Sequence, residues 1–168
     1  MDLLYVHLLL NHFPLVGLIG SLLLLAGALF TRSRDVAIAA LIGVVLAALV
    51  AIPVYFTGEP AEHGIEGVSG VNHDAIEEHQ DAALWAIIAM EAAGVVALFS
   101  VAVAFRRGMV PRGALVVTLI ISLWAAAVIA RTAQLGGKIR HTEIGGASAT
   151  QDADDDGGGR GRGRSGGR

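Results

Sequence analysis

The sequence predicts an all-α fold: an integral membrane four-helix bundle with a disordered C-terminal tail. First, 54% of the 168 residues are hydrophobic and the mean hydropathy is +0.64, above the range of ordinary soluble domains. Second, the apolar residues come in four long blocks, each close to or above the ~20 residues that an α-helix needs to cross a bilayer. Third, backbone polar groups in lipid must pair within their own segment, which favours helices for all four blocks.

The predicted helices cover residues 3–30, 36–56, 82–105 and 114–135. The first is longer than a span requires, so its N-terminal turns lie near the interface or the helix is tilted. Pro14 leaves backbone carbonyl groups near residue 10 unpaired, and Pro53 predicts a kink near the end of the second helix. Alanine and glycine recur along the first and third helices, which allows close helix packing in lipid.

The chain divides into a helical domain, residues 1–144, and a tail, residues 145–168. The tail reads "GGASATQDADDDGGGRGRGRSGGR", a low-complexity composition that is typical of disorder. Gly-Arg segments can bind nucleic acid. We expect no nucleic-acid partner here, because the predicted topology places the tail outside the cell.

Charge predicts this topology. The two short connections, residues 31–35 and 106–113, carry Arg32, Arg34, Arg106, Arg107 and Arg112. The connection of residues 57–81 has no Lys or Arg and carries the acids Glu59, Glu62, Glu66, Asp74, Glu77, Glu78 and Asp81. The positive-inside rule then puts the short connections in the cytoplasm and both termini and the long connection outside. We expect a multi-pass protein of a bacterial inner membrane or plasma membrane, with the lipid bilayer as its first partner.

All six histidines lie on the predicted outer side, namely His7, His12, His63, His73, His79 and His141. Imidazole is the commonest neutral ligand of metals and haem iron. The absence of cysteine excludes disulfides, thiolate-bound iron–sulfur clusters and CxxCH haem attachment. The histidine distribution therefore favours a site for haem or a metal at the outer face.

The segment "HLLLNHFP" begins the first helix. His7 and His12 are separated by five residues, about 140° around an α-helix, so they cannot both point at one small ion. His7 and Asn11 share a helix face, and Asn11 can orient His7 or hydrogen-bond a ligand. Polar anchoring at the membrane interface is the alternative role of the two histidines.

The segment "IEEHQDAALW" leads into the third helix. Its acids suit a helix N-terminus, where they cap and solvate. Alternatively, Glu78 accepts a proton from the ligating imidazole of His79. Glu91 is the one acid well inside a span, nine residues past Ala82 and about 13 Å deep. An intramembrane carboxyl is a functional candidate, although a structural hydrogen bond to a neighbour such as Ser122 explains it equally well.

The fourth helix is followed by "GGKIRH". We expect Gly136 and Gly137 to end the helix and allow a sharp turn, which brings His141 toward His12 and His79. Arg131 and Arg140 then lie near the same place and can meet haem propionates. Snorkelling to the interface is the alternative role of Arg131.

The motifs "HLLLNHFP", "TGEPAEH", "IEEHQDAA" and "GGKIRHTEIG" resemble the signatures of a bacterial family of small four-helix membrane proteins, known as a domain of unknown function. The resemblance spans residues 3–145. The motif positions correspond to His7, Asn11, His12, Pro14, Thr57, Gly58, Glu59, Pro60, Glu78, His79, Gly136, Gly137, Arg140 and His141. The resemblance implies a helical bundle, and a cytochrome b-like role is an attractive interpretation for such proteins.

Our leading hypothesis is a b-type haem protein that passes electrons near the outer face, as an electron-transfer or accessory subunit and not a stand-alone enzyme. Bis-histidine haem needs two imidazoles from different helices. We predict His12 and His79 as the first pair, with His7 and His141 as alternatives or a second pair, and Arg131 and Arg140 at the propionates. Other membrane or periplasmic redox proteins would be its partners.

Two alternatives remain open. In the first, the protein binds zinc or copper through His12, His79 or His141 together with Glu59, Glu62 or Glu78. In the second, it is a structural or assembly subunit of a larger membrane complex, and its polar outer face is a docking surface without a cofactor.

Overall fold

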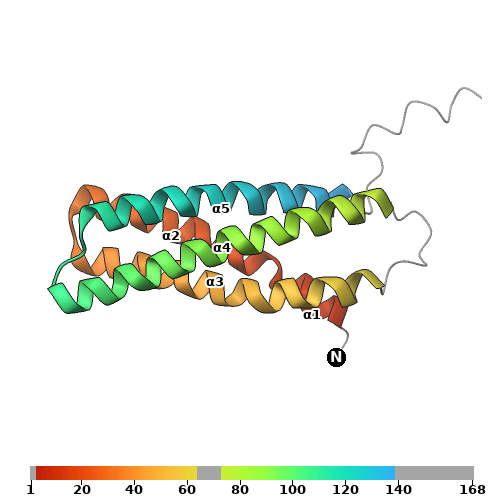
Figure 1. The fold of residues 1–168 in the computed structure, drawn as a ribbon, viewed down its shortest axis with the longest axis horizontal. Coiled ribbons are helices and arrows are strands. Elements are labelled where there is room, and N and C mark those ends of the chain that lie inside the picture. The colour runs from red at the N-terminus through yellow and green to blue at the C-terminus, as the bar shows by residue number, and fades with distance from the viewer. Residues whose placement is uncertain (1–2, 64–72, 139–168) are drawn as a thin grey trace, which may run out of the picture.

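The computed structural model describes residues 3–63 and 73–138, and all its described elements are helices (Figure 1). They are α1 (Leu3–Leu10), α2 (His12–Thr31), α3 (Arg34–His63), α4 (His73–Arg107) and α5 (Arg112–Lys138). The all-α prediction is confirmed. The tail predicted for residues 145–168, together with His141 and Arg140, lies outside the described residues.

The four long helices form an antiparallel bundle in which each helix packs against two neighbours. α2 packs against α3, α3 against α4, α4 against α5, and α5 closes the ring by packing against α2. α1 directly precedes α2 in the chain but packs mainly along the end of α3, away from the α4–α5 pair (Figure 1). The ends of the bundle are therefore different: α1 adds a fifth segment at only one of them.

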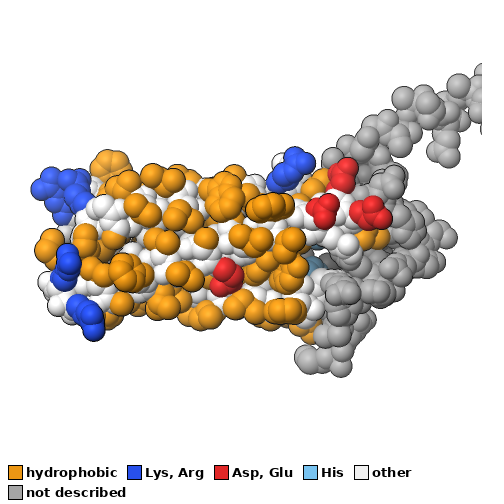
Figure 2. Space-filling model, viewed as in Figure 1, with side chains coloured by type: hydrophobic (Ala, Val, Ile, Leu, Met, Phe, Trp, Pro, Cys, Tyr) orange, Lys and Arg blue, Asp and Glu red, His pale blue; other side chains and the backbone are white. Residues whose placement is uncertain are grey.

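The outside of the bundle is apolar, as a membrane protein requires. Four helical segments are long and apolar enough to cross a bilayer: Tyr5–Thr31, Arg34–Gly58, Ile76–Arg107 and Arg112–Gly137. Large side chains such as Phe56, 72% exposed, and Leu23, 71% exposed, project outward along them. Figure 2 shows a broad hydrophobic surface with arginine side chains gathered at one end and most of the acidic side chains at the other; a basic side chain lies near the acidic end, and an acidic side chain lies within the hydrophobic surface. An apolar surface this continuous marks contact with lipid and not with water.

Small residues let the helices approach closely, as the sequence predicts. A Cβ atom added at Gly94 of α4 would lie 2.6 Å from Ala48 Cβ of α3, and one added at Gly17 of α2 would lie 3.4 Å from Ala47 Cβ. Ser21 of α2 lies directly against Gly43 of α3. Packing of this kind stabilises helix pairs in lipid, where the hydrophobic effect no longer drives association.

Most buried hydroxyl groups in this core are satisfied within their own helix. Ser21 donates to the carbonyl oxygen of Gly17 at 2.8 Å, Ser100 to that of Val96 at 2.7 Å, and Thr118 to that of Ala114 at 2.8 Å. Such bonds to the preceding turn allow Ser and Thr to sit in an apolar interior. Ser122, also fully buried, has no partner for its hydroxyl among the described residues.

The arginine-bearing end is formed by two tight turns. Arg32 ends α2 with a left-handed backbone (φ 56°), and its N–H bonds to the carbonyl oxygen of Ala28 at 2.9 Å. Gly108, with φ +69°, lies in the turn between α4 and α5. Arg112 joins the turns by donating to the carbonyl oxygen of Leu29 at 3.4 Å. These turns fall within the short connections that the sequence predicts.

The helix boundaries depart from the predicted ones in two ways. The first predicted helix is divided at Asn11, three residues before Pro14, where the proline leaves a carbonyl group without its donor. The second and third helices are longer than predicted, because α3 continues through Pro53 to His63 and α4 begins at His73. α5 likewise continues through Gly136 and Gly137 to Lys138, so the predicted helix end at the two glycines is not observed.

A candidate histidine site at the acidic end of the bundle

The site is built at the end of the bundle opposite the arginine turns, where α3 and α5 end and α4 begins. We call this the acidic end, because Glu77, Glu78 and Asp81 lie on the surface of α4 there. His7 reaches it from α1 and His79 from α4. These are the two predicted histidines whose hydrogen bonds the structure describes.

His7 is anchored on α3. Its Nδ1 atom lies 3.1 Å from the carbonyl oxygen of Val54 and 3.2 Å from Thr57 Oγ1. Because a carbonyl oxygen only accepts hydrogen bonds, Nδ1 carries the proton in the neutral ring and the lone pair is on Nε2. The Thr57 hydroxyl itself donates to the carbonyl oxygen of Pro53 at 2.8 Å. The ring lies beside Gly58, where an added Cβ would be 3.6 Å from His7 Cε1.

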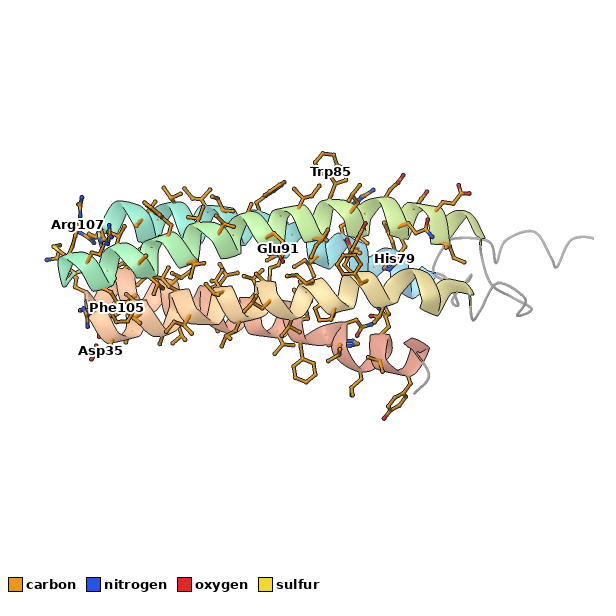
Figure 3. All side chains as sticks on the ribbon, turned by 60° about the horizontal axis from the view of Figure 1, so that its bottom comes forward. Asp35, His79, Trp85, Glu91, Phe105 and Arg107 are labelled. Carbon is orange, nitrogen blue, oxygen red and sulfur yellow. The ribbon has the colours of Figure 1, made fainter. Side chains whose placement is uncertain are left out.

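His79 is anchored in the same way on α5. Its Nδ1 atom lies 3.0 Å from the carbonyl oxygen of Thr132, so this ring too has its lone pair on Nε2 when it is neutral. The imidazole lies against Gly136, where an added Cβ would be 3.2 Å from Cε1 and 3.3 Å from Nδ1. His79 extends from the inner side of α4 near its N-terminal end (Figure 3). A side chain larger than hydrogen at position 136 would displace the ring.

The two histidines share one chemical arrangement. Each comes from a different helix, and the Nδ1–H group of each donates a hydrogen bond to a backbone carbonyl group of a neighbouring helix. A backbone carbonyl that holds the distal ring nitrogen fixes both the tautomer and the orientation of a ligating histidine. The acidic end therefore holds two imidazoles whose Nε2 atoms have the electronic form of a ligand.

The predicted first pair, His12 with His79, is not formed. His12 is exposed on α2, whereas the buried side of that helix carries Pro14, Leu18, Ser21, Leu25 and Ala28. α2 packs against α3 and α5, and no packing between α2 and α4 occurs in the described part of the chain. His12 thus sits on the lipid side of the bundle and diagonally from His79, because the rotational setting of α2 turns position 12 outward.

Asn11 lies one helical turn after His7 on the same helix face, as the four-residue spacing predicts. It is half-buried, and its backbone N–H donates to the carbonyl oxygen of His7 at 2.9 Å. Its side-chain oxygen Oδ1 is buried and has no hydrogen-bond partner among the described residues. A buried amide oxygen without a donor is an acceptor available to a bound group.

For several predicted residues the structure describes the backbone but not the side chain. Glu59 lies within α3, and the structure describes its helix position but not its side chain. The same holds for His63 and His73, which end α3 and begin α4. Across residues 3–63 and 73–138, no group of three or more histidine, aspartate or glutamate side chains is arranged to hold a metal ion.

Glu91 lies near the middle of α4 (Figure 3). Its Oε1 atom is buried without a hydrogen-bond partner in the described chain, as is Ser122 Oγ of α5. His79 of α4 contacts Thr132 and Gly136 of the antiparallel helix α5. Glu91 comes twelve residues after His79, and Ser122 comes ten to fourteen residues before Thr132 and Gly136, so the two residues lie at a similar depth in the bundle. No hydrogen bond joins the two groups.

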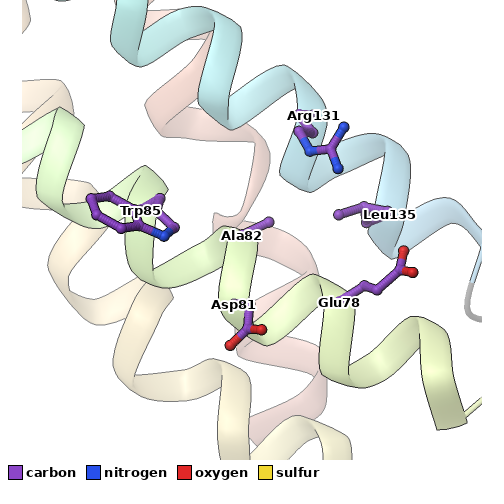
Figure 4. A pocket seen from close by; sticks show the side chains of 6 residues that line it. All are labelled: Glu78, Asp81, Ala82, Trp85, Arg131 and Leu135. Atoms are coloured by element: carbon purple, nitrogen blue, oxygen red, sulfur yellow. The ribbon is translucent and has the colours of Figure 1, made fainter.

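Arg131 lies in a groove between α4 and α5. The groove encloses about 330 Å³ and is lined by Glu78, Asp81, Ala82, Trp85, Arg131 and Leu135 (Figure 4). No histidine is among these residues. Arg131 and Glu78, predicted beside the histidines, therefore face this groove, whereas His79 packs against Thr132 and Gly136.

The anchors of the two histidines could be predicted only in part. Thr57, Gly58 and Gly136 occur in the motifs quoted above, and each touches or lies beside an imidazole. The carbonyl groups of Val54 and Thr132 carry no signal in the sequence, because every residue has a carbonyl group and only the fold selects one.

No protein-family model, curated protein or solved structure matches this chain. The family resemblance of the motifs stays a prediction, and the geometry of the chain itself must support any function.

Proposed function

We propose that this membrane protein binds b-type haem at the acidic end of its bundle and serves as an electron-transfer or accessory subunit. The observation that carries the proposal is the matched anchoring of His7 and His79, which each donate Nδ1–H to a backbone carbonyl group of another helix, α3 for His7 and α5 for His79. In this proposal the two Nε2 atoms would be the axial ligands, and haem would lie between α1 and α4, which do not pack against each other in the described part of the chain. When bound, haem supplies reversible one-electron chemistry at its iron.

The donor set fits haem better than zinc or copper. Protein zinc sites use three or four protein ligands, and the described residues hold no group of three. A haem needs only two axial imidazoles, since the porphyrin provides the other four nitrogens. Zinc or copper remains the second candidate only if side chains of residues 59–75 or 139–144 complete a site.

Each neighbouring residue has a role in this proposal. Val54 and Thr132 fix the imidazole planes through their carbonyl oxygens, and Thr57 supports His7. Asn11 offers its unpartnered Oδ1 atom to a water molecule beside the bound group. Arg140 remains the proposed partner of a propionate, and His141 remains an alternative ligand. Arg131 lines the groove between α4 and α5.

We place the acidic end outside the cytoplasm, in a bacterial inner membrane or plasma membrane. The five arginines of the two short turns support this orientation, because positively charged connections are retained on the cytoplasmic side. The haem would then exchange electrons with membrane or periplasmic redox proteins. The bundle would contribute binding and positioning, without a substrate of its own.

The test is the reduced-minus-oxidised absorbance spectrum of the full chain, purified from cells supplied with a haem precursor. We expect a Soret band and a sharp α-band, with one haem for each chain. Protein that carries neither haem nor bound metal would instead support the assembly-subunit alternative. Stoichiometric zinc or copper in the same sample would support the second candidate.

A further inference from the structure

The groove between α4 and α5 carries separated charges of both signs. Glu78 and Asp81 line it from α4 and Arg131 lines it from α5; in Figure 4 the Glu78 carboxyl group points toward the α5 side, whereas that of Asp81 points away from it. No ion pair within 4.0 Å joins Arg131 to Glu78 or Asp81, all three of which have side chains that the structure describes. The groove thus presents two carboxylates and one guanidinium that do not neutralise one another.

We expect the groove to lie at the depth of lipid headgroups. Its residues occupy the ends of two membrane spans, Ile76–Arg107 and Arg112–Gly137, at the acidic end. Trp85, 59% exposed, forms one side of the groove, and tryptophan is enriched where hydrocarbon meets headgroups. Ala82 and Leu135 provide an apolar floor. A volume of about 330 Å³ is at the small end of ligand pockets, enough for a headgroup but not for a whole lipid.

We propose that this groove binds the headgroup of a zwitterionic aminophospholipid, phosphatidylethanolamine, from the outer leaflet. The phosphate would bind Arg131, because a guanidinium pairs with phosphate through two parallel hydrogen bonds. The primary ammonium group would donate to the carboxylate of Glu78, and Asp81 would add negative charge on the same helix. The acyl chains would leave along Trp85 toward the exposed apolar surface of α4.

The charge pattern distinguishes this lipid from its common competitors. Phosphatidylglycerol would satisfy Arg131 but would leave two carboxylates beside a net negative headgroup. Phosphatidylcholine has the same net charge as phosphatidylethanolamine, but its quaternary ammonium has no N–H to donate. The pair of acids beside the arginine therefore favours a headgroup with a primary amine.

The experiment measures lipid binding to the full chain by native mass spectrometry in detergent. The chain is titrated in parallel with phosphatidylethanolamine, phosphatidylglycerol and phosphatidylcholine of identical acyl chains. We expect phosphatidylethanolamine to bind about tenfold more tightly than either competitor, the effect of one charge-assisted hydrogen bond. Inorganic phosphate is added as a competitor, and we expect it to displace no lipid at millimolar concentration.

Two variants separate the ends of the headgroup. Glu78→Gln combined with Asp81→Asn should remove the preference for phosphatidylethanolamine and leave the binding of phosphatidylglycerol unchanged or stronger. Arg131→Gln should weaken both lipids about tenfold. Arg106→Gln makes the same chemical change at the opposite end of the bundle and should alter neither affinity. Circular dichroism spectra establish that all variants remain helical.

The proposal is overturned if the three lipids bind equally, or if the acid-to-amide double variant keeps the wild-type preference. Stronger binding of phosphatidylglycerol would identify an anionic-lipid site. Displacement by inorganic phosphate would identify a free-phosphate site. The proposal does not depend on haem, so an absent Soret band leaves its test intact.

Discussion

His79 Nδ1 donates a hydrogen bond to the carbonyl oxygen of Thr132, 3.0 Å away on the neighbouring helix. The bond fixes one ring nitrogen of a histidine at the end of a membrane bundle. One helical turn further along α5, Gly136 provides the space that the ring occupies. α5 therefore determines where the imidazole of α4 lies, and it presents the Nε2 atom as the lone-pair nitrogen.

The first prediction concerns this contact. Gly136→Val should displace the imidazole of His79, because even a Cβ atom at position 136 would lie 3.2 Å from Cε1. We expect haem affinity to fall about tenfold or more, as it does when the support of a ligating histidine is lost. Titration of the apoprotein with haem, followed at the Soret band, measures the affinity.

Gly137→Val is the matched control, because a Cβ atom at position 137 would meet nothing within 4 Å. Both variants replace a helical glycine with the same β-branched residue. Equal loss of haem affinity in the two variants would show that the contact with His79 has no part in the effect.

The second prediction concerns helix packing. Gly94→Ala should lower the free energy of unfolding by about 1–3 kcal/mol, because the new methyl group would lie 2.6 Å from Ala48 Cβ and push α3 and α4 apart. Gly20→Ala adds the same methyl group where nothing lies within 4 Å. Thermal unfolding in detergent compares the two, and a Gly94→Ala protein as stable as Gly20→Ala would contradict the close packing.

The third prediction concerns the buried hydroxyl group of Ser122. Ser122→Ala should leave the unfolding free energy unchanged or raise it slightly, because its hydroxyl has no partner among the described residues. Ser100→Ala removes a hydroxyl that donates to the carbonyl oxygen of Val96 at 2.7 Å, and it should cost about 0.5–1 kcal/mol. If Ser122→Ala is the more damaging change, then Ser122 binds water or Glu91 in the membrane.

The fourth prediction concerns orientation. The chain has no cysteine, so single cysteines report their own accessibility. Glu77→Cys, on the acidic end, should react with a membrane-impermeant maleimide in intact cells. Met109→Cys, in the turn between α4 and α5 and 61% exposed, should react only after the membrane is opened. The reverse pattern would put the histidines in the cytoplasm and refute the proposed location.

Hydropathy and charge were sufficient to predict the spans and the arginine turns. Both depend on bulk transfer energies, which composition determines. The division of the first helix at Asn11 was not predicted, although the missing N–H of Pro14 had indicated unpaired carbonyl groups near residue 10. The extension of α4 back to His73 was not predicted, because a charged helix that projects beyond the hydrocarbon has no apolar signal.

The histidine pairing needed information that the sequence lacks. A position on a helix has a definite direction only once the rotational setting of that helix is known. Pro14 and Leu18 of α2 face the core of the bundle, so His12 of the same helix points outward. His7 faces α3 because α1 leaves the axis of α2 at Asn11 and packs along the end of α3. The change of direction at Asn11 therefore places His7, and not His12, at the site.

The most direct test of the central claim compares haem binding by the unmodified chain with that of His7→Ala, His79→Ala and His12→Ala. We predict a bis-histidine spectrum for the unmodified chain and for His12→Ala. We also predict loss of the low-spin α-band in both of the other variants. A wild-type spectrum in His7→Ala or His79→Ala, or no haem in the unmodified chain, would contradict the account.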